Sequence, residues 1–209
     1  MTTAFRTGFL ALAVALAGFA ALAVAQGAVG KRRITVASVT YDIPSEAKPG
    51  YIDGQDSLFM QFALPDYGPL RRDVHGWEDN VNLLITRQPD PISRQYENQW
   101  DGTPIGKKLK WNSIQNTYRI EPGFTVQEMG SGFDIVIPDQ DRSTMPLGVM
   151  QCGKPKEFLP NAACELMFDR DGQRWKVSFG RQFMAQYGAI RTRVEAVMDG
   201  WRVREGNVK

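Results

Sequence analysis

The segment Cys164–Gly180, with the sequence CELMFDRDGQRWKVSFG, decides the fold of this chain. Apolar side chains recur at every second position on both sides of a turn sequence, Asp169–Gly172. These apolar positions are Cys164, Leu166, Phe168, Trp175, Val177 and Phe179. The pattern predicts two antiparallel strands that share one apolar face, joined by a tight turn.

The residues that follow, 181–201, predict a long amphipathic helix. Apolar side chains recur at spacings of three and four residues, which places them on a single stripe. They are Phe183, Tyr187, Ile190, Val194, Val197 and Trp201. Because such a stripe must be buried, we expect the helix to pack on the apolar face of the sheet that contains the hairpin.

Shorter apolar runs upstream predict further strands and one short helix, with Gly- and Pro-containing turns between them. We expect strands at 33–43, 58–64, 80–86, 117–120, 124–129, 133–137 and 149–152, and a helix at 92–100. The predicted fold class is α+β: a mostly antiparallel sheet of about six to eight strands, covered by one long C-terminal amphipathic helix and preceded by an N-terminal hydrophobic leader or anchor helix.

The N-terminal segment 1–30 has one charged side chain, Arg6, and residues 8–25 are only Gly, Phe, Leu, Ala and Val. It is predicted to be a secretory signal, with small residues at Ala23 and Ala25 for cleavage, or a transmembrane anchor. The remaining 31–209 is predicted to be a single globular domain.

The leader indicates a periplasmic protein, or an inner-membrane protein that faces the periplasm. A third alternative is a cytoplasm-facing membrane anchor, because the basic triplet Lys31–Arg33 follows the apolar run directly and resists translocation.

Two cysteines, Cys152 and Cys164, flank a turn-rich stretch that contains Gly153, Pro155 and Pro160. In an oxidising compartment this arrangement predicts a structural disulfide. The spacing fits neither a zinc site nor a Cys-x-x-Cys redox motif.

The overall charge is nearly balanced, with 25 Lys and Arg against 23 Asp and Glu. No basic field indicates a nucleic-acid partner. The single histidine, His75, excludes a His-rich metal site and any mechanism that needs two imidazoles. No metal site and no cofactor are predicted.

Two groups of residues are candidates for function. Aromatic and basic side chains in the loop-like stretches at 66–80 and 88–116 are candidates for a binding face: Trp77, Trp100, Trp111, Lys107 and Lys108. The acidic group Asp134, Asp139 and Asp141 supplies weak candidates for catalytic carboxylates.

These observations favour a non-enzymatic protein of the cell envelope that binds a protein partner, either an accessory subunit or an immunity-type inhibitor of a secreted toxin. The alternatives are an envelope hydrolase that uses the carboxylates, and a carrier of a small molecule or lipid with a cavity between sheet and helix.

Overall fold

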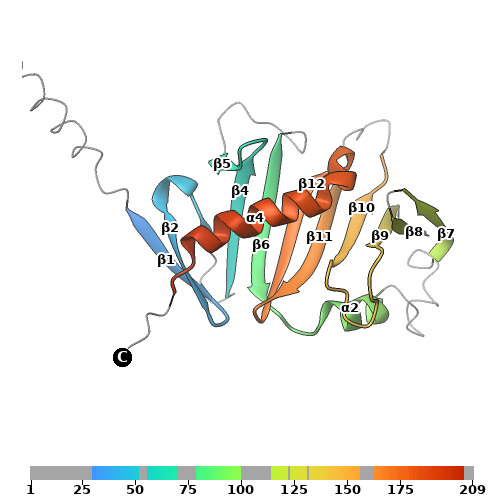
Figure 1. The fold of residues 1–209 in the computed structure, drawn as a ribbon, viewed down its shortest axis with the longest axis horizontal. Helices are drawn as coiled ribbons and strands as arrows, with labels where there is room; N and C mark the ends of the chain where they lie inside the picture. The colour runs from blue at the N-terminus through green and yellow to red at the C-terminus, as the bar shows by residue number, and fades with distance from the viewer. Residues whose placement is uncertain are drawn as a thin grey trace, which may run out of the picture.

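A computed structural model of the chain describes residues 30–51, 56–69, 79–99, 114–121, 123–130, 132–155 and 162–204. Figure 1 shows a large sheet, crossed on one face by a long helix near the C-terminus, and a separate two-stranded sheet formed by β1 (Lys31–Val36) and β2 (Val39–Pro44). The leader predicted at 1–30 lies outside the described residues except for Gly30.

Strands dominate the described residues. They are β1 (Lys31–Val36), β2 (Val39–Pro44), β3 (Gly50–Tyr51), β4 (Ser57–Ala63), β5 (Gly68–Pro69), β6 (Asn80–Arg87), β7 (Ile114–Ile120), β8 (Phe124–Met129), β9 (Phe133–Pro138), β10 (Val149–Gly153), β11 (Ala163–Arg170) and β12 (Gln173–Gly180). The helices are α2 (Ile92–Gln99) and α4 (Tyr187–Trp201), with 3₁₀ turns η1 (Ser45–Ala47) and η3 (Arg181–Gln186). The α+β class, with a mostly antiparallel sheet and one C-terminal helix, is confirmed.

The main sheet has ten strands in the order β3-β4-β6-β12-β11-β10-β9-β8-β7, with β5 on the outer side of β4. After β6 the chain passes through α2 to the far end of the sheet. It then returns strand by strand from β7 to β12 (Figure 1). This meander places the last strand, β12, in the middle of the sheet beside β6.

The hairpin of β11 and β12 has the predicted form. The strands pair in register from Ala163 opposite Gly180 to Arg170 opposite Gln173. The two turn residues, Asp171 and Gly172, have φ of 53° and 72°. Two consecutive positive φ values give the tight turn whose twist matches that of the flanking strands.

The main core lies between this sheet and α4, which crosses β4, β6, β12 and β11 (Figure 1). Leu83, Val177 and Leu166 occupy neighbouring strands in one row beneath the helix and are fully buried. Of the predicted stripe, Ile190 and Val194 are buried.

The helix differs from the prediction at its start, because residues 181–186 form the 3₁₀ turn η3 and the α-helix begins at Tyr187. Met198, which was not part of the predicted stripe, is fully buried, whereas Val197 is only partly buried.

A second core lies on the opposite face of the sheet, at the end formed by β8, β9 and β10. Ile92 and Tyr96, one turn apart on α2, pack there on Ile135 and Val149. Sheet and short helix therefore bury a separate set of side chains from those under α4.

The strand predicted at 33–43 is wrong. The segment is a hairpin of two strands, β1 and β2, which form their own two-stranded sheet. The turn contains Ala37, with φ 52°, and the Ala37 N–H donates to Asp56 Oδ1 at 2.9 Å. Tyr41 on β2 donates its hydroxyl to Gln173 Oε1 at 2.9 Å, which ties the hairpin to β12.

The predicted disulfide is confirmed. Cys152 on β10 lies opposite Cys164 on β11, and their sulfur atoms are bonded at 2.07 Å. Both cysteines belong to strands, as the sequence predicted. Among the helices that the structure describes, none is long and apolar enough to cross a membrane.

Candidate protein-binding surface

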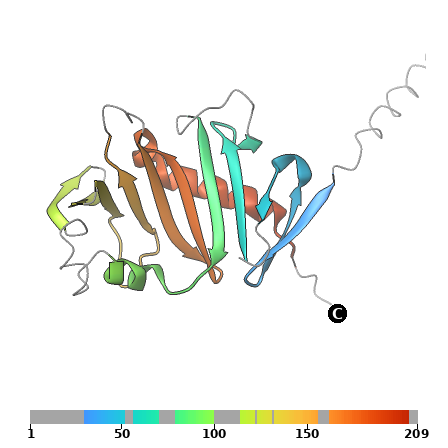
Figure 2. The same ribbon diagram turned by 180° about the vertical axis from the view of Figure 1, so that it is seen from behind.

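One face of the main sheet is open over β4, β6, β12 and β11, as Figure 2 shows from the side opposite α4. In the described part of the chain, α2 and Met145, which lies between β9 and β10, pack on this face at the far end of the sheet. The side chains on the uncovered strands are half-buried or exposed, as expected for a sheet face in contact with water. We call this surface the open face; its residues are Phe59, Gln61, Asn82, Leu84, Gln151, Glu165, Lys176 and Ser178.

A polar row crosses the open face from strand to strand. Gln61, Asn82, Ser178, Glu165 and Gln151 lie opposite one another in the registers of five successive strands. The Gln61 side-chain N–H donates to Asn82 Oδ1 at 3.0 Å. The row therefore presents amide, hydroxyl and carboxylate groups along a fixed line.

A second row beside it mixes apolar and charged side chains. Phe59, which is 39% exposed, lies opposite Leu84, and Leu84 lies opposite Lys176. Lys176 Nζ is 3.3 Å from Glu165 Oε1, the diagonal contact expected across an antiparallel pair. The second row therefore exposes two apolar side chains, Phe59 and Leu84, next to a charged pair.

The open face ends where Arg174 fixes α2 to the sheet. The Arg174 side chain is almost fully buried, and its Nε lies 2.5 Å from Asp169 Oδ1. Its guanidinium also donates to Gln95 and, at 2.6 Å, to the carbonyl of Asp90. Asp169 in turn accepts the first N–H of the helix, that of Ile92, at 2.6 Å. This polar centre keeps α2 at its end of the sheet and leaves the neighbouring strands uncovered.

At the opposite end, beside β4, an open groove of about 290 Å³ runs between η1, β4, β5 and the end of α4. Phe62 and Trp201 stack in it with ring centroids 6.4 Å apart, and Tyr67 lies beside them. Burial raises the pKa of Tyr67, partly offset by Arg193, so the phenol is neutral at physiological pH. Glu46 and Gln61 complete the polar part of the lining.

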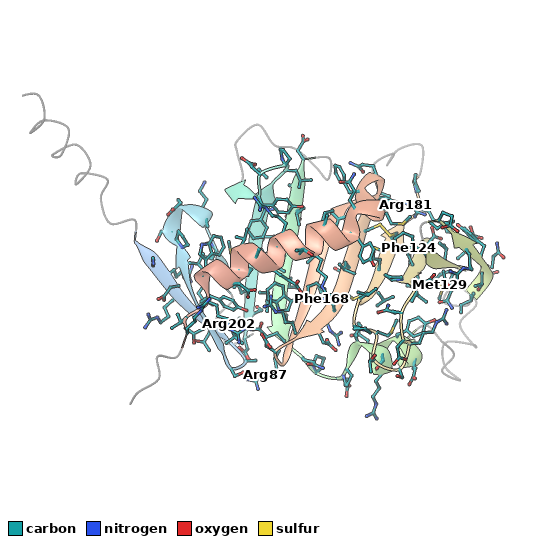
Figure 3. All side chains as sticks on the ribbon, in the orientation of Figure 1. Arg87, Phe124, Met129, Phe168, Arg181 and Arg202 are labelled. Atoms are coloured by element: carbon teal, nitrogen blue, oxygen red, sulfur yellow. A yellow bond between two sulfur atoms is a disulfide. The ribbon has the colours of Figure 1, made fainter. Side chains whose placement is uncertain are left out.

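The predicted carboxylate Asp134 is not on the open face. It is buried on the α4 side of β9, where Oδ2 accepts from Arg181 Nη2 at 2.6 Å and Oδ1 lies 3.5 Å from Lys154 Nζ. Arg181 also donates to the carbonyl of Gly153 at 2.7 Å. Figure 3 shows Arg181 at the start of the helical segment, so this ion pair fixes the entry to α4 on β9 and β10.

The other two predicted carboxylates have separate partners. Asp139 pairs with Arg119 on β7. Asp141 accepts hydrogen bonds from the N–H of Ser143 at 2.9 Å and from its hydroxyl at 2.8 Å, and these bonds lower the pKa of its carboxyl. Among the described residues, no three His, Cys, Asp or Glu side chains are placed to hold a metal ion.

The fold has a counterpart among solved structures. No protein-family model and no curated protein match the chain. Smlt3025, an immunity protein of the Stenotrophomonas maltophilia type IV secretion system, has a similar fold. The superposition has a TM-score of 0.63 and covers 84% of this chain and 94% of that one. The sequences are 10% identical, so the likeness concerns the fold alone.

The structure brings together residues that the sequence did not single out. The predicted binding residues Trp77, Trp100, Trp111, Lys107 and Lys108 lie outside the described residues. The open face instead collects the polar positions of several strands, such as Lys176 and Ser178, which alternate with the core residues of β12. The alternation of polar and apolar residues along each strand indicated which side chains face water. It did not indicate that they form a row across the sheet, because that depends on the strand order.

Proposed function

We propose that this protein is an exported, non-enzymatic binding module of the immunity type, which neutralises a toxin protein by docking it on the open face. The observation that carries the proposal is an uncovered sheet face in a fold similar to that of the immunity protein Smlt3025. Phe59 and Leu84 are apolar side chains that a docking protein would bury there, and the polar row beside them offers hydrogen-bonding groups.

A rigid scaffold supports this function. The main core lies directly behind the open face, and the second core lies beside the open face on the same side of the sheet. The strands of the open face are held from behind by fully buried side chains such as Leu83 and Val177. A surface that is fixed before binding loses little conformational entropy when the partner arrives. The face can therefore act as a preformed inhibitor surface.

The two alternative functions receive no support from the described residues. Asp134, Asp139 and Asp141 each have a structural partner, and two of them stabilise turns or helix entry. The main core between sheet and α4 is filled by buried side chains with 0 to 5% exposure, which leaves a carrier function without a binding cavity there.

For the location, we propose that residues 1–30 direct the globular domain 31–209 to the periplasm. The Cys152–Cys164 bond supports this, because structural disulfides persist in oxidising compartments. The leader acts as a cleaved signal or as an anchor, and both place the open face where a toxin delivered into the envelope would meet it.

A competition experiment tests the proposal. A strain of the native host that lacks this protein is grown in contact with its parent, which still makes the toxin. The deletion strain is expected to be killed, and the full-length chain supplied in trans is expected to protect it. Equal survival of both strains would count against an immunity function.

A matched pair of variants tests the surface. Ser178 lies in the middle of the open face, so Ser178→Arg places a long charged side chain where the toxin would dock. Ala189 is exposed on α4, and Ala189→Arg adds the same group on the other side of the sheet. Both variants should melt with the wild type, and only Ser178→Arg should fail to protect. Protection by both would exclude the open face.

A further inference from the structure

We propose that the groove beside β4 receives a basic side chain, arginine or lysine, of the protein that docks on the open face. This inference rests on the proposed function and names the chemical group that the partner presents at one edge of the contact. Its basis is an aromatic wall, an uncompensated carboxylate and continuity with the polar row.

The aromatic wall comes from Trp201 and Tyr67, with Phe62 behind Trp201. The rings of Phe62 and Trp201 are inclined by only 26°, so they stack and hold the indole in place. Phe62 is buried, whereas Trp201 and Tyr67 are only partly buried and line the groove. The face of an indole or phenol ring carries partial negative charge and attracts a cation placed over it.

The charge of the groove has the sign that a basic side chain requires. Glu46, on η1, is exposed and has no ion-pair partner among the described residues. The carboxylate of Asp66 lies beside Gly68, which also lines the groove. Burial raises the pKa of Tyr67, and the positive charge of Arg193 partly offsets that rise. Arg193 precedes Trp201 by eight residues, which corresponds to about 12 Å along the helix. Among the described residues that line the groove, Glu46 is the one charged side chain, so the lining carries a negative charge.

The groove is continuous with the open face through Gln61. This side chain lines the groove and is also the first member of the polar row, bonded to Asn82 at 3.0 Å. A protein seated on the row would therefore reach the groove with a side chain at its edge. Arginine and lysine have both the length and the apolar stem to lie along an aromatic wall.

A titration of the full chain with two small probes tests this inference. N-acetyl-arginine amide supplies the cation, and N-acetyl-citrulline amide has nearly the same shape without the charge. The signal is the Trp201 indole N–H resonance in a ¹H–¹⁵N spectrum, assigned with Trp201→Phe. The arginine probe is expected to shift this resonance, and the citrulline probe is not.

Two variants measure how much the charge of Glu46 contributes to binding of the arginine probe. Glu46→Gln is expected to weaken binding of the arginine probe by about two- to fivefold, the range of an exposed cation–carboxylate contact. Glu97 is exposed on α2, at the other end of the sheet, and Glu97→Gln should bind the probe as the wild type does. Unchanged melting of both variants shows that they fold.

An unshifted Trp201 resonance, equal shifts with both probes, or equal affinity of the two variants would overturn the inference. None of these results bears on Ser178→Arg, so the proposed function would still be judged by the competition experiment alone. Binding of the arginine probe together with equal survival in that experiment would also overturn the inference, because no partner would dock beside the groove.

Discussion

The two ends of the sheet are covered in different ways. From β4 to β11, α4 lies on one face of the sheet over an apolar core, and its fifteen residues bury Ile190, Val194 and Met198. At the β8–β10 end, α2 lies on the other face and has eight residues. It is fixed largely by the polar centre at Arg174. The position of α4 depends mainly on apolar packing, whereas the position of α2 depends on both apolar packing and hydrogen bonds.

This difference explains where the protein has free surface. Because α4 lies on the other face of the sheet and α2 covers only one end, neither helix covers the open face (Figures 1 and 2). The sheet between them is supported from the α4 side and exposed on the other. Variants at each end should therefore separate packing from polar contributions.

The largest effect is expected from Trp175→Ala in the main core. Trp175 is 1% exposed, packs on Phe168 with ring centroids 5.7 Å apart, and donates its indole N–H to Gln173. Phe168 lies beneath α4 (Figure 3). Removing the ring should cost about 3–5 kcal/mol of unfolding free energy, measured in urea. Phe59→Ala on the open face, as the control, should cost far less; similar losses would mean that burial does not distinguish the faces.

The junction between the two ends should respond next. Replacing Cys152 and Cys164 together by alanine removes a cross-link over a sequence separation of 12. In the chain-entropy description, that loss is about 3 kcal/mol of unfolding free energy. Urea unfolding of the double variant and of the oxidised wild type gives the value. Equal stabilities would show that the β10–β11 pairing alone fixes this junction.

A smaller and local effect is expected from Arg174→Met. The change leaves Asp169, Gln95 and the carbonyl of Asp90 without their common donor, at a cost of about 2 kcal/mol. Hydrogen exchange should accelerate in the amides of α2 and remain unchanged in α4. Lys176→Met, which removes an exposed pair on the same strand, is the control. Faster exchange in both helices would contradict the separate fixing of α2.

The smallest expected effect is a dependence of the unfolding free energy on pH, which comes from Tyr41 in the main core. Burial raises the pKa of Tyr41 from 10.0 to about 12, so the folded protein favours the neutral phenol. The stabilisation is complete below pH 10, where both states are neutral, and is lost as pH rises toward 12 because the unfolded chain ionises first. Tyr41→Phe should flatten this alkaline loss, as followed by urea unfolding at several pH values. Tyr118→Phe, at an exposed tyrosine on β7, should keep the wild-type profile.

Local patterns predicted most of the longer strands and both helices, but not the turn that divides 33–43. The alternation around Asp171 and Gly172 predicts the β11–β12 hairpin because both the period and the turn chemistry are present in one segment. The turn at Ala37 has no such signal. Alanine disfavours positive φ, and its amide is bound by Asp56, nineteen residues away. A contact of that range leaves no trace in the pattern of 33–43.

The open face could not be predicted from the sequence for a related reason. Loops and acidic groups attract attention in a sequence, whereas the polar partners of an alternating strand look like ordinary solvent-facing residues. Gln61, Ser178 and Gln151 become neighbours of one row only because β12 is inserted between β6 and β11. That strand order depends on long-range pairing, which local periodicity does not encode.

The central place of β12 has a consequence for how the molecule is completed. In the pair formed by β4 and β6, the other edge of β6 has no hydrogen-bonding partner until β12 pairs with it. The chain continues from β12 through η3 into α4. Contacts between segments so distant in the chain form slowly, after a long loop has closed. The same event supplies Lys176 and Ser178 to the open face, so maturation of the fold and acquisition of the binding surface coincide. A chain interrupted before β12 would have neither.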